Sequence, residues 1–270
     1  MQSADSYYNK LVLTNPLREP LFRSIVSSLS LPRGSEGLDA GCGAGLQSLI
    51  LAEATGPKGR VTGIDISPDL IHHARNAIKK RAYADFVRLL QGDLNHLPFK
   101  EASFDWIWSA DAVGYGDHSS LRQFSELSRV LKPGGTAAIL AWSSEQLLPG
   151  YPGLEARLRA TGPGLAPFSE RTKPEEHFLR GTGLLKKAGF AYVSIKSFLG
   201  DVQGPLDNEN RIALEELLAM RWPGAEKELG PKEADLLERL ISPDSKDYIL
   251  KQKDYYAFFT YTMLFGVKGE

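Results

Sequence analysis

The sequence contains almost no cysteine, no long apolar run and no signal-like start. A single cysteine among 270 residues cannot form an internal disulfide, so nothing in the chain favours an oxidising compartment. Residues 1–10 are polar and acidic, whereas a secretory signal is basic and then apolar. The longest apolar stretches, residues 137–142 and 261–267, fall far short of the roughly 20 residues that cross a bilayer. We therefore expect a cytoplasmic protein without a membrane span.

An excess of either charge is also missing. The chain has 32 Lys and Arg against 33 Asp and Glu, a formal net charge of −1. Because this balance supplies no global positive field and no basic patch stands out, we do not expect nucleic acid as a partner. The five histidines and the one cysteine show no metal-ligand spacing, so we predict no metal site.

Helical and strand-like patterns alternate between about residues 19 and 142. Such alternation predicts right-handed crossovers and a parallel α/β sheet with helices on both faces. We expect one strand to end near residue 40 and others to cover residues 60–65, 86–91, 105–109 and 136–142. The intervening helices are expected near residues 21–29, 46–54, 68–78 and 121–131.

Beyond residue 142 the alternation breaks down. Residues 143–174 are rich in proline and glycine and predict an irregular insertion, followed by a helix over 175–188 and a sixth strand over 192–198. Further helices over 205–255 precede a last strand over 258–267. We expect one domain over residues 1–270, with an N-terminal helical segment at 1–34, a cofactor-binding core at 35–142, and helical insertions at 143–174 and 205–255 that form a substrate cap.

The most informative segment is the glycine loop, residues 37–45 (GLDAGCGAG), between a strand and a helix. Glycines here permit a sharp turn and let a ligand approach bare backbone. A dinucleotide fingerprint requires Gly-x-Gly-x-x-Gly, but the sixth position counted from Gly41 is Leu46. Asp39, which precedes that glycine, suits a cationic group and is out of place beside a pyrophosphate.

A second carboxylate, Asp65, ends the second predicted strand, about 20 residues after Gly45. A carboxylate in this place can accept hydrogen bonds from both hydroxyls of a ribose. Together with an ammonium-facing Asp39, it describes a nucleoside linked to an amino acid better than a dinucleotide. The predicted cofactor is S-adenosylmethionine, with S-adenosylhomocysteine as its product.

The chain also resembles a known family through a series of motifs. These are LDAGCGAG (38–45), GIDIS (63–67), QGDLNHLPF (91–99), FD (104–105) and RVLKPGG (129–135). In this order they resemble the motifs of class I S-adenosylmethionine-dependent methyltransferases, in the group that includes the ubiquinone and menaquinone C-methyltransferases. The resemblance covers residues 35–142. It implies a Rossmann-like, mostly parallel sheet of seven strands, of which the last, residues 258–267, is antiparallel.

The resemblance further implies which residues hold the cofactor. The loop residues and Ser109 would face its methionine end, Asp65 its ribose, and Ile66, Asp93 and Leu94 its adenine. The full predicted set is Tyr8, Asp39, Gly41, Gly43, Gly45, Asp65, Ile66, Asp93, Leu94 and Ser109.

Residues that face the acceptor are expected in the loop after the fourth predicted strand. This loop reads ADAVGY at 110–115, where many relatives carry histidines. The catalytic candidates are Asp111, Tyr115 and His118, with His118 as a general base. Tyr7 and Tyr8 precede the first predicted helix, a position from which relatives fold an aromatic ring over the cofactor.

The predicted reaction is transfer of a methyl group from S-adenosylmethionine to a small-molecule acceptor with an O, N or C nucleophile. It proceeds by in-line displacement, so catalysis rests on positioning and exclusion of water, and a base is needed only if the acceptor must lose a proton. An apolar cap is compatible with an apolar or aromatic acceptor. Two alternatives stay open: a nicotinamide-dependent oxidoreductase and a non-catalytic, methyltransferase-like binding subunit.

Overall fold

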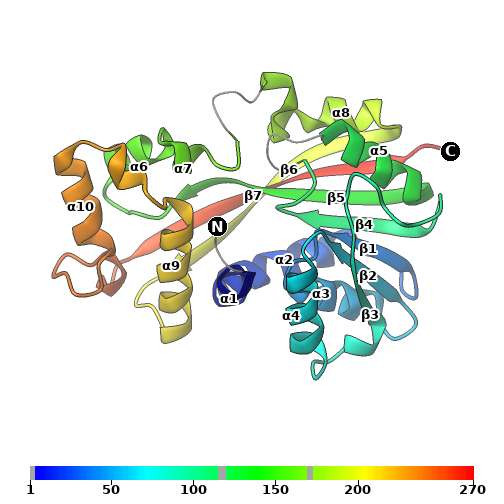
Figure 1. Ribbon diagram of the computed structural model, residues 1–270, viewed down its shortest axis with the longest axis horizontal. Helices are drawn as coiled ribbons and strands as arrows, with labels where there is room; N and C mark the ends of the chain where they lie inside the picture. The colour runs from blue at the N-terminus through cyan, green and yellow to red at the C-terminus, as the bar shows by residue number, and fades with distance from the viewer. Residues whose placement is uncertain (1–3, 115–119, 169–172) are drawn as a thin grey trace.

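A computed structural model describes residues 4–114, 120–168 and 173–270. Its sheet has seven strands in the order β3-β2-β1-β4-β5-β7-β6 (Figure 1). Strands β1 to β5 run parallel, and β7 pairs antiparallel with both β5 and β6, which confirms the predicted fold class. The strands are β1 Glu36–Ala40, β2 Arg60–Asp65, β3 Val87–Gln91, β4 Phe104–Ala110, β5 Leu131–Gln146, β6 Phe190–Gln203 and β7 Tyr256–Lys268.

Helices cover both faces of the sheet (Figure 1). One face carries α2 (Asn15–Leu29), α3 (Leu46–Thr55) and α4 (Pro68–Ile78). The other carries α5 (Ser120–Val130) and α8 (Gly181–Lys187), which pack against each other. Helix α4 begins as the sequence indicates, since the Ser67 side chain accepts a hydrogen bond from the Leu70 backbone N–H and a proline follows the cap.

Three strands are longer than their sequence pattern predicts. Strands β5, β6 and β7 extend beyond the rest of the sheet, and Gln146 and Asp201 still pair with Phe258 near the far end (Figure 1). The helices α6 (Pro152–Arg159), α7 (Gly162–Leu165), α9 (Asn208–Arg221) and α10 (Pro231–Ile241) gather around this extension. The fifth strand continues past Trp142, where the proline- and glycine-rich sequence predicts its end, and a register shift lies between Trp142 and Ser144.

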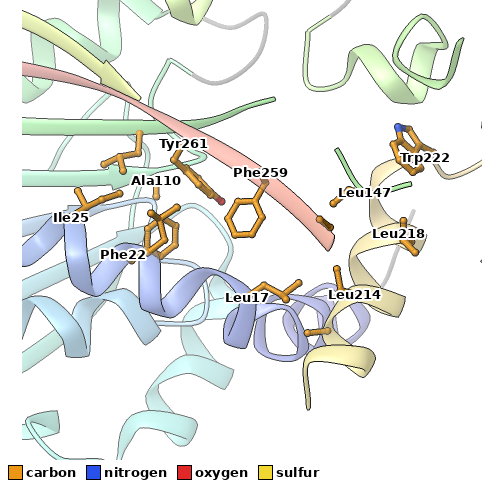
Figure 2. Packing of buried hydrophobic residues seen from close by; sticks show 14 of the residues in the cluster. Leu17, Phe22, Ile25, Ala110, Leu147, Leu214, Leu218, Trp222, Phe259 and Tyr261 are labelled. Atoms are coloured by element: carbon orange, nitrogen blue, oxygen red, sulfur yellow. The ribbon is translucent and has the colours of Figure 1, made fainter. Parts of the chain in front are cut away.

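One apolar cluster joins the sheet to these outer helices (Figure 2). Phe22 of α2 lies under β7. Leu214 within α9 and Trp222 at the end of that helix belong to the same cluster. Leu147 and Leu240 are fully buried in it as well. The insertions therefore share the main core and do not form a separate unit.

Two helical expectations are wrong in detail. The helix expected over 175–188 consists of two 3-10 turns, η2 (Pro174–Glu176) and η3 (Phe178–Arg180), followed by the short α8. Tyr7 and Tyr8 do not precede the first helix, because they lie within α1 (Ala4–Leu13). The remaining 3-10 turns are η1 (Ala84–Phe86), η4 (Ala225–Lys227) and η5 (Ile249–Lys251).

Among the described residues, no helix has the length and apolar character to span a membrane.

Substitution of Gly37 in β1 would test the packing beneath the predicted cofactor loop. A Cβ at Gly37 would overlap the ring of Trp106, which is buried and held by a hydrogen bond to Ser35 Oγ. We expect Gly37→Ala to lower the free energy of unfolding by about 1–3 kcal/mol through overpacking, measured by urea denaturation. Gly183→Ala in α8, where nothing lies within 4 Å of the added methyl, should raise stability by up to about 1 kcal/mol. Equal stability of the two variants would contradict this account.

Candidate functional site

The glycine loop follows β1 at the carboxyl end of the parallel strands. Gly41 and Cys42 both donate their backbone N–H to the Ile64 carbonyl, at 2.8 and 3.0 Å, which ties the loop to β2. Gly41, Gly43 and Gly45 have φ values of +86°, +49° and +73°, in the region that side chains disfavour. The loop backbone thus requires glycine, and it presents bare peptide groups to a ligand.

Asp65, the last residue of β2, connects this loop to the next helix. Its Oδ2 accepts a hydrogen bond from the Gly43 backbone N–H at 2.9 Å, and its Oδ1 accepts one from the Ser67 backbone N–H at 3.0 Å. A carboxylate oxygen can accept a further hydrogen bond, so both oxygens keep capacity for a ligand. Ile66 beside it is 68% exposed, although it is a large apolar residue.

A cavity of about 830 Å³, here called the loop cavity, opens at this edge of the sheet. Of the predicted cofactor residues, Gly41, Gly43, Asp65 and Ile66 contribute to its wall. Its lining consists of Tyr7, Leu11, Asn15, Arg18, Gly41, Cys42, Gly43, Ala44, Leu46, Gln47, Asp65, Ile66, Ser67, Asp69, Leu70, Ala110, Asp111 and Ala112. Bare backbone, a carboxylate and an exposed apolar side chain fit the amino acid, ribose and adenine parts of S-adenosylmethionine.

Asp39 lies beneath the loop and not in the cavity wall that the described residues form. It is 1% exposed, and Ser48 Oγ donates a hydrogen bond to its Oδ2 at 2.5 Å. Burial raises the pKa of Asp39 to about 7, while the bond from Ser48 opposes the shift. The carboxylate therefore fixes β1 to α3 from below.

Three further predicted cofactor residues make local contacts. Asp93 Oδ1 accepts hydrogen bonds from the Asn95 backbone at 2.8 Å and from the Asn95 side chain at 2.9 Å, and these bonds lower the pKa of Asp93. Leu94 packs partly buried against the core. Ser109 is fully buried, and its hydroxyl accepts a bond from the Val113 backbone N–H at 3.2 Å. Within the described part of the chain, none of the three lines the loop cavity.

The two neighbouring tyrosines of α1 point to different places. Tyr7 lines the loop cavity. Tyr8, the residue selected from the sequence, lies against His73 of α4 with ring centroids 5.2 Å apart. Because successive residues of a helix point about 100° apart, only one of the pair can face the cavity, and the structure places Tyr7 there.

Asp111 follows β4 and joins three strands. Its Oδ1 accepts a hydrogen bond from the Trp142 backbone N–H at 2.8 Å, and its Oδ2 accepts one from the Tyr261 hydroxyl at 2.6 Å. Figure 2 shows the Tyr261 ring projecting from β7 toward α2. Burial raises the pKa of Asp111, and the two hydrogen bonds together with nearby Arg18 oppose that shift. Tyr115 and His118, the other two catalytic candidates, lie outside the described residues.

A second cavity, of about 400 Å³ and here called the apolar cavity, adjoins the first. The two share Tyr7, Leu11, Arg18 and Asp111. The full lining is Tyr7, Leu11, Thr14, Leu17, Arg18, Asp111, Trp142, Pro163, Ala166, Pro167, Leu217, Met220, Arg221, Pro223 and Tyr261. The insertions that were predicted to form a cap supply the seven residues from Pro163 to Pro167 and from Leu217 to Pro223.

Arg18 of α2 lines both cavities, although it is not among the site residues predicted from the sequence. A signal for it existed: Phe22 and Ile25 lie four and seven residues further along, on the buried stripe of the same helix. A charged residue on that stripe is unusual, because an ionised side chain is rarely buried without a partner. Arg18 therefore stands out as a charged residue on the apolar face of α2.

Comparisons with known proteins agree with this geometry. A family model described as a methyltransferase domain matches residues 38–135. The chain is similar to the demethylmenaquinone methyltransferase of Staphylococcus aureus, with 29% identity over 195 residues that cover 67% of this chain and 78% of the relative.

Solved structures resemble the fold. The YcgJ protein of Bacillus subtilis superposes with a TM-score of 0.57 at 17% identity, covering 92% of this chain and 98% of its own. A SAM-dependent methyltransferase of Aquifex aeolicus gives a TM-score of 0.52 at 24% identity, covering 72% and 91%.

The family model spans the glycine loop, the Asp65 strand and the start of β5, the region that supplied the sequence motifs. The predicted cofactor, S-adenosylmethionine, is confirmed, and with it an enzymatic function in place of either alternative. Residues 38–135 carry a methyltransferase domain, and the chain transfers a methyl group from S-adenosylmethionine to a small-molecule acceptor.

Proposed function

We propose that the acceptor is an apolar aromatic molecule of the quinol class and that it binds in the apolar cavity. The observation that carries this proposal is the common wall of the two cavities, formed by Tyr7, Leu11, Arg18 and Asp111. Ligands in the two cavities would meet at this shared boundary, where the donor methyl of one and the nucleophile of the other could approach each other. The similarity to demethylmenaquinone methyltransferases supports the quinol class.

The loop cavity is the proposed cofactor site. The backbone of Gly41 and Gly43 would hold the methionine end, Asp65 the ribose hydroxyls and Ile66 the adenine. The exposed side chain of Ile66 supports its role, since a bound ring would cover it. Tyr7 replaces Tyr8 as the aromatic residue over the cofactor, on the basis of its position in the wall.

The remaining cofactor residues of the sequence prediction act less directly in this proposal. Asp39 holds the loop from below through Ser48, and Ser109 holds the turn after β4 through Val113. Asp93 and Leu94 lie beyond Gln91, at the end of the strand next to Asp65, and would border the adenine end. Asp93 and Leu94 contact neighbouring protein groups, so their substitution should act through the shape of the site.

The two insertions form the proposed acceptor cap. Residues of 143–174 and of 205–255 line the apolar cavity together with Trp142 and Tyr261 of the extended strands. Leu217 and Met220 supply flexible apolar surface from α9. Such a lining favours a ring compound over a small hydrophilic amine, because an amine would lose its hydration while the one carboxylate of the lining, Asp111, is already engaged by Trp142 and Tyr261.

The bound cofactor supplies a methyl group on a positively charged sulfur, a good leaving group. The chain's residues would orient the acceptor, exclude water and remove a proton where the acceptor has one to lose. Asp111 is the proposed base, since its carboxylate lies in the wall common to both cavities. Its raised pKa brings proton transfer closer to neutral pH than an ordinary aspartate would allow.

The ribose role of Asp65 predicts a loss of cofactor affinity on substitution. We expect Asp65→Ala to weaken S-adenosylmethionine binding by about 1–3 kcal/mol, because the ribose hydroxyls and the Gly43 and Ser67 N–H groups lose their acceptor. Isothermal titration calorimetry measures the change. Asp85→Ala, at an exposed position in η1, is the matched control and should bind normally. Unchanged affinity in Asp65→Ala would refute the assignment.

The acceptor class predicts which compounds are methylated. With S-adenosylmethionine, we expect the protein to methylate 1,4-naphthoquinol, kept reduced by dithiothreitol, and to leave glycine and phosphoethanolamine unmodified, as followed by mass spectrometry. Leu217→Trp, which fills the apolar cavity, should raise the acceptor KM at least about tenfold while cofactor affinity stays normal. Leu121→Trp, at an exposed site on α5, is the control. Methylation of the amines alone would overturn the proposal.

A base at Asp111 predicts a pH-dependent rate. The pKa of Asp111 is raised, so the carboxylate becomes protonated at a higher pH than usual, and the rate should fall as pH drops through that value. Asp111→Asn should reduce kcat by about 10²–10⁴ and abolish this acidic limb. Asparagine tolerates the φ of +55° at this position, so the fold should persist. A variant that keeps the wild-type rate and acidic limb would exclude the role.

A further inference from the structure

Arg18 has an unused hydrogen-bonding group at the boundary between the two cavities. One terminal nitrogen, Nη2, donates to the Leu11 carbonyl at 3.2 Å and to Thr14 Oγ1 at 2.7 Å, which anchors the guanidinium to α1 and to the turn before α2. Its Nε is buried and has no hydrogen-bond partner among the described residues. A buried donor without a partner is energetically unfavourable, and a bound ligand that accepts a hydrogen bond from it would remove that cost.

The positive charge of Arg18 faces hydroxyl and carboxyl groups. A guanidinium stays protonated in proteins, so its positive charge is permanent. The groups that face it are Tyr7, Asp111 and Tyr261. Burial lowers its pKa, but Tyr261 and Asp111 outweigh that effect and leave the pKa raised. Asp111 is the one carboxylate of this set, and it is already engaged with Trp142 and Tyr261.

Among the described residues, no carboxylate forms an ion pair with Arg18, whereas Arg221, the other arginine of the apolar cavity, pairs with Glu145 at 2.9 Å. Arg221 also donates to the carbonyls of Pro163 and Gly164, so its hydrogen bonds serve the cap itself. Arg18 therefore differs from Arg221 in keeping both charge and a donor for a bound molecule.

We infer that Arg18 is a specificity-determining residue that binds an ionised hydroxyl oxygen of the acceptor at the boundary of the two cavities. The inference rests on the proposed function and deepens it, because it requires an acceptor with an acidic hydroxyl on an aromatic ring. A protonated amine would meet the permanent positive charge of Arg18 and be repelled. An oxyanion would instead gain a charge-assisted hydrogen bond from the guanidinium.

The test measures the acidity of a bound phenol without turnover. The probe is 4-nitrophenol, whose phenolate absorbs at longer wavelength than the phenol, titrated with pH in the presence of saturating S-adenosylhomocysteine. We expect the wild-type protein to bind it as the phenolate and to make it about tenfold more acidic or more, as an adjacent guanidinium does to an acid. Benzylamine, of similar size and opposite charge, should fail to displace it.

Variants separate the role of Arg18 from a merely structural one. Arg18→Met should abolish the acidity shift, and Arg18→Lys, which keeps the charge but loses the planar fork, should retain part of it and preserve folding. Arg23→Met is the matched control, because Arg23 lies on the same helix, outside both cavities, and pairs with Glu19 and Glu53. Its shift should equal that of the wild type.

The outcomes separate this inference from the proposed function. Failure of 4-nitrophenol to bind, an unchanged acidity of the bound probe, an Arg18→Met variant that keeps the shift, or displacement by benzylamine would each overturn the role of Arg18. A shifted acidity that survives unchanged in Leu217→Trp would instead show that the oxyanion does not occupy the apolar cavity, which contradicts the proposed location of the acceptor.

Discussion

The carboxylate of Asp111 is the constraint on which the rest of the site depends. Its backbone N–H is bonded to Leu140 of β5 at 2.9 Å, and its two oxygens accept from Trp142 of β5 and Tyr261 of β7. One residue thus holds the end of β4 against two longer strands and sets the wall between the cavities. Because these bonds satisfy a buried acid, the wall is rigid where positioning matters for methyl transfer.

The length of β5, β7 and β6 gives the enzyme its second cavity. The short strands β1 to β4 end at the edge where the glycine loop and Asp111 line the loop cavity. The three longer strands continue past that edge and form a platform on which α6, α7, α9 and α10 pack (Figure 1). Trp142 and Phe259 stack on this platform with ring centroids 4.7 Å apart, and buried apolar residues of α6, α9 and α10 belong to the same cluster as Phe259.

Much of the cofactor half could be predicted from the sequence because its signals are local. A loop with positive φ at Gly41, Gly43 and Gly45 favours glycine at those positions, and Asp65 ends its strand where a carboxylate is typical of a ribose contact. The ends of the strands were harder to predict from the sequence. The register shift after Trp142 and the prolines near residue 150 hid the extension of β5, since both are also typical of loops.

The choice between Tyr7 and Tyr8 illustrates the same limit. Both are tyrosines in one helix, and only the packing of α1 against α4 turns Tyr8 toward His73 and Tyr7 toward the cavity. Asp39 has the residue type for an ammonium contact, but Ser48 and the surrounding core engage it from below. Residue type limits what a side chain can do, whereas its neighbours decide which of those interactions it makes.

The sequence by itself determined the parallel sheet and the cofactor, because these depend on periodicity, glycine positions and carboxylates within single segments, whereas the antiparallel last strand was implied by the resemblance to the methyltransferase family. The tertiary structure alone decided which residues surround the apolar cavity. Arg18, Asp111, Leu217 and Tyr261 are separated by long stretches of chain and meet only when β7 inserts between β5 and β6 and α2 packs beneath them. No local pattern encodes such a meeting, since it results from long-range pairing and from burial of a common core.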